Sequence, residues 1–183
     1  MKSKAAWRNT VWRRVWALPL LLLTACEAPL ESVAWAVRTV FPQVTQHSVS
    51  WLVDQRQAHG DEILLLDVRT PEEFGISHIE GARRAATLEE ARALLGGRPK
   101  DQLIVVYCSV GYRSSQLAAL LLEGGYTQVV NLEGSIFAWA NAGEPVVRDG
   151  REVRAVHPYG PIWERFLAPK YREYPADRLE KNR

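Results

Sequence analysis

The chain has 183 residues, with 23 Lys and Arg against 21 Asp and Glu, so its formal net charge is +2 at pH 7. This length suits one domain with appendages. Five of the basic residues precede Cys26, and the chain from Cys26 onward carries 18 basic and 21 acidic residues, a net charge of −3. A nucleic-acid-binding domain needs a clustered basic surface, so this balance argues against nucleic acid as a partner.

The N-terminal segment is typical of an export signal. A basic region, Lys2 to Arg14, is followed by an apolar stretch, Val15 to Leu23. That stretch is too short to span a bilayer, which takes ~20 apolar residues, but it fits a secretory signal peptide. The sequence Leu23-Thr24-Ala25-Cys26 resembles the bacterial lipobox, which implies cleavage after residue 25 and a lipid on Cys26. We therefore expect a lipid-anchored protein of the bacterial cell envelope, facing the periplasm or the exterior. An ordinary signal peptide or a retained anchor is the alternative.

The chain contains two cysteines. If Cys26 carries a lipid, Cys108 is the remaining thiol, and no intramolecular disulfide can form even in a compartment that permits one. No pair of cysteines and no Cys/His cluster has the spacing of a metal site, so we expect neither metal nor cofactor. An unused free thiol outside the cytoplasm is exposed to oxidation, so the sequence indicates that Cys108 has a function.

We interpret residues 26–45 as a linker, and a short helix near the membrane is the alternative for this segment. The expected elements of the domain begin after it. Ser48 or Ser50 can cap a helix that reaches about Ala58. The continuous apolar run Ile63 to Val68 predicts a strand covered on both faces. Thr70 to Phe74 has the pattern of a capped first helical turn with proline at its start.

The residues that follow, up to 142, are expected to alternate between strands and helices. The expected elements are a loop at 78–82 leading to a short extended piece, a helix at 88–95, a strand at 103–107, a helix at 114–123, a strand at 128–132 and a helix at 136–142. This alternation predicts an α/β fold with a mostly parallel sheet and helices on both faces. Ligands of such sheets bind at the C-terminal ends of the strands, where Asp67 and Cys108 are expected to lie.

A C-terminal tail follows, residues 147–183, with nine basic and six acidic residues, four prolines and interleaved aromatic residues. Prolines at this density interrupt regular structure. We expect the tail to pack across the domain through its aromatic residues while its charges stay in solvent. The alternative is an arm that binds a protein partner or a membrane surface.

Cys108 is the most informative residue, because it follows an apolar strand and precedes a short loop and a helix. A helix N-terminus favours an anion through its unpaired N–H groups and its dipole, and such settings lower the pKa of a cysteine. A cysteine that only fills space is the alternative. We predict Cys108 as the nucleophile and Arg113, whose forked donors suit an oxyanion or the loop's own backbone, as its stabilising group. The residues expected to bind substrate, largely through consecutive backbone N–H groups, are Ser109, Val110, Gly111, Tyr112 and Ser114.

The length of this loop argues against a different thiolate chemistry. Phosphatases that use a thiolate have a longer loop between cysteine and arginine, because a tetrahedral phosphate needs a wider cradle. Here four residues, Ser109 to Tyr112, separate Cys108 from Arg113. The spacing therefore disfavours a phosphatase or an arsenate reductase.

Three segments together resemble the rhodanese family. Leu66 to Phe74 with His78 to Ala82 is similar to the first rhodanese signature, Cys108 to Ser114 to the active-site loop, and Leu132 to Trp139 to the closing signature. The resemblance implies a single rhodanese domain at residues 46–146 with a sheet of about five strands. It also implies a sulfurtransferase that moves sulfane sulfur from a donor such as thiosulfate through a Cys108 persulfide to a thiol or cyanide-like acceptor. Ser77 and Glu80 stand where the family usually has glycine and proline.

The family pattern also places Asp67 and Arg69 near the site, either supporting it from behind or forming a structural ion pair. His78 is expected to brace the loop rather than act as a base, since a thiolate stabilised by N–H groups needs none. Two other functions stay open. One is a non-catalytic rhodanese-fold scaffold at the membrane, and the other is a redox thiol protein.

Overall fold

The computed structural model describes residues 30–175. The expected signal peptide at 1–25, the lipidation site Cys26 and residues 176–183 lie outside the described residues. Within the described part, no helix has the length and apolar character needed to cross a membrane.

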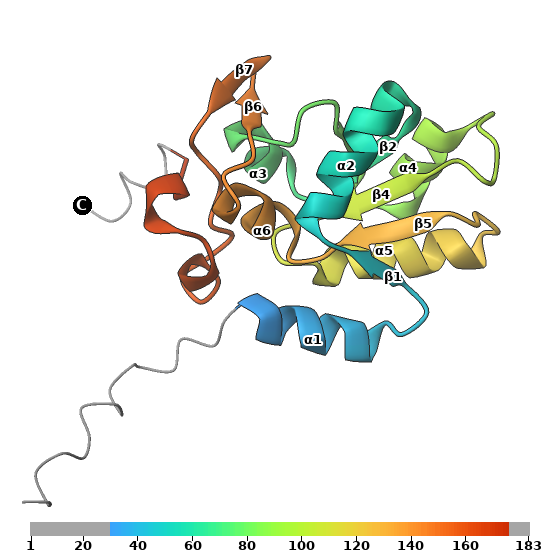
Figure 1. Ribbon diagram of the computed structural model, residues 1–183, viewed down its shortest axis with the longest axis horizontal. Coiled ribbons are helices and arrows are strands. Elements are labelled where there is room, and N and C mark those ends of the chain that lie inside the picture. Colours follow the sequence, from blue (N-terminus) through green and yellow to red (C-terminus); the bar gives the residue numbers. More distant parts are fainter. Residues whose placement is uncertain (1–29, 176–183) are drawn as a thin grey trace, which may run out of the picture.

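A five-stranded sheet forms the centre of the structure, with the strand order β1-β5-β4-β2-β3 (Figure 1). All four strand pairs are parallel, which confirms the expected α/β class. Its strands are β1 (Thr45–His47), β2 (Leu64–Asp67), β3 (Arg83–Arg84), β4 (Ile104–Tyr107) and β5 (Val129–Leu132). The sequence did not predict β1, because these three residues contain no apolar run. The central strand β4 leads directly into Cys108.

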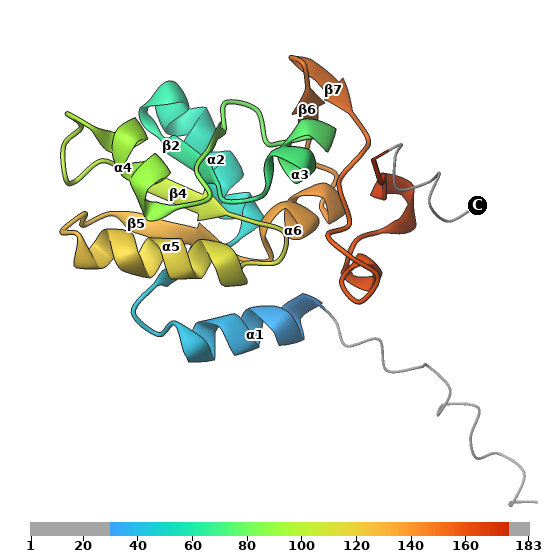
Figure 2. The same ribbon diagram turned by 180° about the vertical axis from the view of Figure 1, so that it is seen from behind.

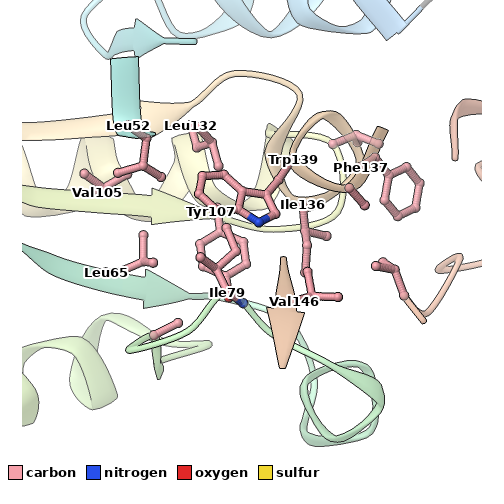
Figure 3. Packing of buried hydrophobic residues seen from close by; sticks show 14 of the residues in the cluster. Leu52, Leu65, Ile79, Val105, Tyr107, Leu132, Ile136, Phe137, Trp139 and Val146 are labelled. Atoms are coloured by element: carbon pink, nitrogen blue, oxygen red, sulfur yellow. The ribbon is translucent and has the colours of Figure 1, made fainter. Parts of the chain in front are cut away.

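Helices cover both faces of this sheet, so the side chains of the central strands β2 and β4 alternate between two buried clusters. Leu65 and Val105 belong to the cluster beneath α2 (Val49–His59) and α6 (Ser135–Asn141), which Figure 3 shows from close by. Leu64 and Ile104 belong to the cluster beneath α4 (Leu88–Leu95) and α5 (Tyr112–Glu123). A strand covered on both sides has no polar face, which is why the segments around β2 and β4 read as continuous apolar runs.

The short helix α3 (Pro71–Ile76) follows the C-terminal end of β2 and begins with a capping box. The Thr70 hydroxyl accepts from the N–H of Glu73, and the Glu73 carboxylate accepts from the N–H of Thr70. Such reciprocal bonds satisfy two N–H groups that a helix start leaves open. They also fix the direction of the Glu73 carboxylate, which is buried.

Residues 30–40 form a helix, α1 (Leu30–Val40), within the segment interpreted from sequence as a linker. Figures 1 and 2 show α1 lying alongside α5. Ala34 and Val37 are buried, and Leu30 and Val33 pack against the core. Apolar residues at this spacing lie on one face of a helix, so burial of that face docks the segment onto the domain.

The tail crosses the domain as far as residue 175, as its aromatic residues led us to expect. It starts as an antiparallel hairpin of β6 (Val146–Arg148) and β7 (Arg151–Val153) and ends in two 3₁₀ turns, η2 (Glu164–Phe166) and η3 (Pro169–Tyr171). Leu167 and Tyr171 are buried in the main core cluster. The Ser77 hydroxyl donates to the carbonyl of Ala155, so the serine that replaces the usual glycine connects the core to the tail.

Asp67 and Arg69 form an ion pair with no exposed side-chain surface. Arg69 Nη2 donates to Asp67 Oδ2 at 2.6 Å and to the carbonyl of Ser77 at 2.6 Å, while Nη1 donates to the carbonyl of Glu73 at 3.3 Å. Burial by itself lowers the pKa of Arg69, but the charge and hydrogen bond of Asp67 outweigh it and raise that pKa. The charged pair therefore ties both ends of α3 to the end of β2.

We expect Arg69→Met to lower the free energy of unfolding by about 3–5 kcal/mol, because it leaves a buried carboxylate without its counter-charge. Denaturant unfolding measures the loss. The double variant Asp67→Asn/Arg69→Met should lose less than the sum of the two single variants, since it removes both charges. A loss of about 0–1 kcal/mol in Arg69→Met, as for an exposed pair, would contradict this role.

Candidate functional site

Cys108 lies immediately after β4, at the C-terminal edge of the sheet, as the sequence predicted. The start of α6 holds its backbone: the N–H groups of Ile136 and Phe137 donate to the carbonyls of Cys108 and Ser109, each at 3.2 Å. The N–H of Cys108 in turn donates to the Ser135 hydroxyl at 3.1 Å. The closing signature thus fixes the position of the loop, and Ser135 is a contact that the sequence did not reveal.

Gly111 allows the loop to curl around the sulfur. Its φ of 110° lies in a region that other residues rarely adopt, and a Cβ here would lie 3.2 Å from the side-chain nitrogen of Asn131. In this conformation the N–H of Gly111 donates to the Cys108 Sγ at 3.1 Å. Both backbone shape and close packing therefore call for glycine at this position.

The surroundings of the sulfur favour the thiolate. Burial raises the pKa of Cys108, but the charge of Arg113, the hydroxyl and N–H of Ser114 and the N–H of Gly111 outweigh it, so the pKa lies below its ordinary value. Cys108 is 1% exposed. It fills space in the core, yet its sulfur also has the hydrogen bonds of a stabilised anion.

Arg113 contacts a partner that the sequence analysis missed, the carboxylate of Glu73. Its Nη1 and Nη2 donate to Oε2 and Oε1 of Glu73 at 2.9 and 2.8 Å, which is a bidentate pair. The Ser109 hydroxyl accepts from Arg113 and donates to Glu73, each at 2.9 Å. The one available signal for Glu73 was its place in a capping box, which does not indicate a long-range partner. Arg113 thus acts on the sulfur through its charge, while its donors hold Glu73 and Ser109.

The Glu73 carboxylate remains ionised even at low pH. Burial raises its pKa, but the hydrogen bond and charge of Arg113, the N–H of Thr70 and the charge of Arg69 lower it to about 2 from an ordinary value of 4.5. A carboxylate whose folded pKa is depressed stabilises the fold above its unfolded pKa. This contribution is therefore complete above about pH 4.5 and is lost as the pH falls toward about 2.

A cavity of about 520 Å³ opens in front of Cys108. Its floor includes the predicted loop residues Ser109, Val110 and Tyr112, whereas Gly111 and Ser114 contact the sulfur from the loop side. Two further walls come from outside the predicted site. These walls are Ser32, Val33, Ala36, Val37 and Val40 of α1 and Tyr159 and Trp163 of the tail.

The other residues considered from sequence brace the site without contacting the sulfur. Asp67 and Arg69 form the structural ion pair described above. His78 stacks on the ring of Phe74 with centroids 3.9 Å apart, and its Nδ1 lies 3.2 Å from the Phe74 carbonyl. These contacts agree with a loop-bracing role for His78. Within residues 30–175, no group of three or more His, Cys, Asp or Glu side chains could hold a metal ion.

A parallel sheet with a thiolate-stabilising loop at its C-terminal edge defines an α/β domain with a nucleophilic cysteine. The family model of the rhodanese-like domain matches residues 48–142, and the chain belongs to this family. These limits lie just inside the expected domain at 46–146.

Two curated relatives are named as sulfurtransferases. A sulfurtransferase of Allochromatium vinosum is 39% identical over 95 residues, which cover 52% of this chain and 88% of that protein. The probable adenylyltransferase/sulfurtransferase MoeZ of Mycobacterium tuberculosis is 37% identical over 87 residues, 47% of this chain but 22% of that protein. Among solved structures, the rhodanese-like domain of Alr3790 from Anabaena sp. is 26% identical with a TM-score of 0.50, and the match covers 56% of this chain and 78% of that one.

We expect the thiolate of Cys108 to form with a midpoint below pH 9.0, its ordinary value. The Arg113→Met variant should raise this midpoint, because it removes the stabilising positive charge and leaves the Glu73 carboxylate nearby. Arg113→Lys, which keeps the charge, should raise it less. The ultraviolet absorbance of the thiolate measures the midpoint, with Cys108→Ser as the blank and thermal melts as the control for folding. Equal midpoints in the wild type and Arg113→Met would contradict the role of Arg113.

Proposed function

We propose that the chain is a sulfurtransferase that carries sulfane sulfur as a persulfide on Cys108. The observation that carries this proposal is the thiolate-stabilising loop, in which the N–H of Gly111 donates to the sulfur at 3.1 Å and Ser114 helps to lower the pKa of the thiol. The same donors suit a persulfide, because its terminal sulfur is also an anion. The two relatives named as sulfurtransferases support this chemistry.

The reaction has two displacement steps. In the first, the Cys108 thiolate attacks the outer sulfur of a sulfane donor, forms an S–S bond and expels the rest of the donor with the electron pair. With thiosulfate as donor, the leaving group is sulfite. In the second step, an acceptor nucleophile such as a thiol or cyanide attacks the terminal sulfur, and Cys108 leaves as the thiolate. The loop presents the same N–H groups to the anionic sulfur before and after each step.

Incubation with a sulfane donor should add the mass of one sulfur atom to the protein, located on the peptide that contains Cys108. The Cys108→Ser variant should gain nothing, since it has no thiolate. Mass spectrometry of the intact protein and of its peptides measures the adduct. If thiosulfate, polysulfide and organic persulfides all fail to modify a folded wild-type chain, the proposal is wrong.

We further propose that the chain is anchored in the bacterial envelope by a lipid on Cys26. The support is the lipobox-like sequence Leu23 to Cys26 after a short apolar stretch. A lipid anchor holds a soluble domain at a membrane surface without a spanning helix. The rhodanese domain would then act at the envelope, facing the periplasm or the exterior.

Cys26→Ser should move the protein out of the membrane fraction of the producing bacterium, because serine cannot accept the thioether-linked lipid. Cell fractionation and labelling with a radioactive fatty acid measure the change. Cys108→Ser is the matched control and should remain labelled and membrane-bound. Labelling that persists in Cys26→Ser would contradict a lipid at this position.

A further inference from the structure

The cavity above Cys108 owes its walls to segments outside the family match. The match covers residues 48–142, whereas α1 spans 30–40 and the tail wall consists of Tyr159 and Trp163. The rhodanese core thus supplies the nucleophile, and the two appendages shape the space in front of it. Features of that space belong to this chain rather than to the family fold.

These walls are mainly apolar. One side consists of the alanine and valine side chains of α1 together with Ser32, another of the two tail aromatics. The volume of about 520 Å³ falls within the ~300–1,000 Å³ typical of ligand pockets. An apolar space of this size at a nucleophilic sulfur fits the body of an organic molecule.

The charge of the cavity disfavours a small dianion such as thiosulfate as its regular occupant. Among the described residues that line it, Arg113 alone is charged, and its guanidinium is already paired with Glu73. A dianion placed against the α1 and tail walls would lose its hydration without gaining an unpaired cation. A neutral thiol with an apolar body loses no such hydration, and the burial of that body is favourable.

We propose that this cavity binds the apolar body of a low-molecular-weight thiol, which is the acceptor of the sulfur on Cys108. The inference rests on the proposed persulfide. In the transfer, the thiol RSH gives its proton to the terminal sulfur of the Cys108 persulfide anion, and the resulting RS⁻ bonds to that sulfur. The S–S bond between the terminal sulfur and Cys108 Sγ breaks, and the products are RSSH and the Cys108 thiolate. Because Cys108 is 1% exposed, the acceptor reaches the sulfur through the cavity, and the α1 and tail walls contact its body.

A series of alkanethiols of increasing length tests the proposal on the 183-residue chain. The chain is loaded with the most efficient sulfane donor, freed of excess donor, and mixed with butanethiol, pentanethiol, hexanethiol or 2-mercaptoethanol. With excess thiol, RSSH reacts with RSH to give RSSR and hydrogen sulfide, which is measured. Each buried methylene is worth about fourfold in affinity, so KM should fall by up to about fourfold for each added methylene until the cavity is full. A KM that does not change with chain length overturns the proposal.

Two glutamate substitutions on α1 distinguish the role of the cavity from a general effect of added negative charge. Ala36 lines the cavity and Thr39 does not, although both are exposed positions of the same helix. Ala36→Glu should abolish the dependence of KM on chain length, whereas Thr39→Glu should retain it. Ala36→Phe keeps the wall apolar but fills part of the cavity, so KM should stop falling at a shorter alkyl chain. Loss of the dependence in Thr39→Glu, or its survival in Ala36→Glu, overturns the proposal.

A binding measurement keeps this test independent of sulfur transfer. Hexyl methyl sulfide has the same apolar body but no S–H, and calorimetry of its binding to the unloaded chain needs no persulfide. Binding to the wild type and Thr39→Glu but not to Ala36→Glu supports the cavity, even if no donor modifies Cys108 and the proposed function fails. If the persulfide forms but KM does not depend on the length of the alkyl chain and the thioether does not bind, the proposed function stands and this inference is wrong.

Discussion

The ion pair between Glu73 and Arg113 connects the two segments on which the site depends. Glu73 comes from the capped first turn of α3, after β2, and Arg113 from the first turn of α5, after β4. The pair closes a bridge between neighbouring strand ends, with the Ser109 hydroxyl bonded to both partners. Glu73 is almost completely buried, with 3% of its side chain exposed. Removal of Arg113 would leave a buried carboxylate unpaired, which is a large penalty. The shape of the Cys108 loop and the start of α3 therefore depend on each other.

This bridge also decides how the site stabilises an anion. A free arginine next to the sulfur would attract any small anion, but here Arg113 is paired with the Glu73 carboxylate. The charge of Arg113 still lowers the pKa of Cys108, and the hydrogen bonds of Ser114 and Gly111 add to this effect at short range and with direction. Such a site holds one anionic sulfur at a fixed position. It suits one anionic sulfur at the end of a side chain better than a doubly charged molecule in the open cavity.

The sequence predicted the sheet, most of the helices and the position of Cys108, because continuous apolar runs, glycines and helix caps are local signals. It did not predict the Glu73–Arg113 pair, since a capping glutamate looks the same whether or not its carboxylate reaches a partner 40 residues away. Ser135 was missed for a similar reason, because its contact with Cys108 depends on how α6 meets the loop. The walls of the cavity were missed because α1 and the tail have signals for burial but none for the surface they cover. All three features depend on long-range packing, which local sequence signals do not report.

The apolar walls and the hydrogen bonds at the sulfur oppose each other, and their balance sets the reactivity of Cys108. Burial raises the pKa of the thiol, whereas Arg113, Ser114 and Gly111 lower it. Residues of α1 line the cavity in front of the sulfur and are part of its apolar surroundings. Oxidants convert an accessible thiolate to sulfenic and then to sulfinic acid, and at 1% exposure Cys108 is shielded from them. The same burial that opposes thiolate formation therefore protects the sulfur, and the hydrogen bonds and the charge of Arg113 keep it reactive.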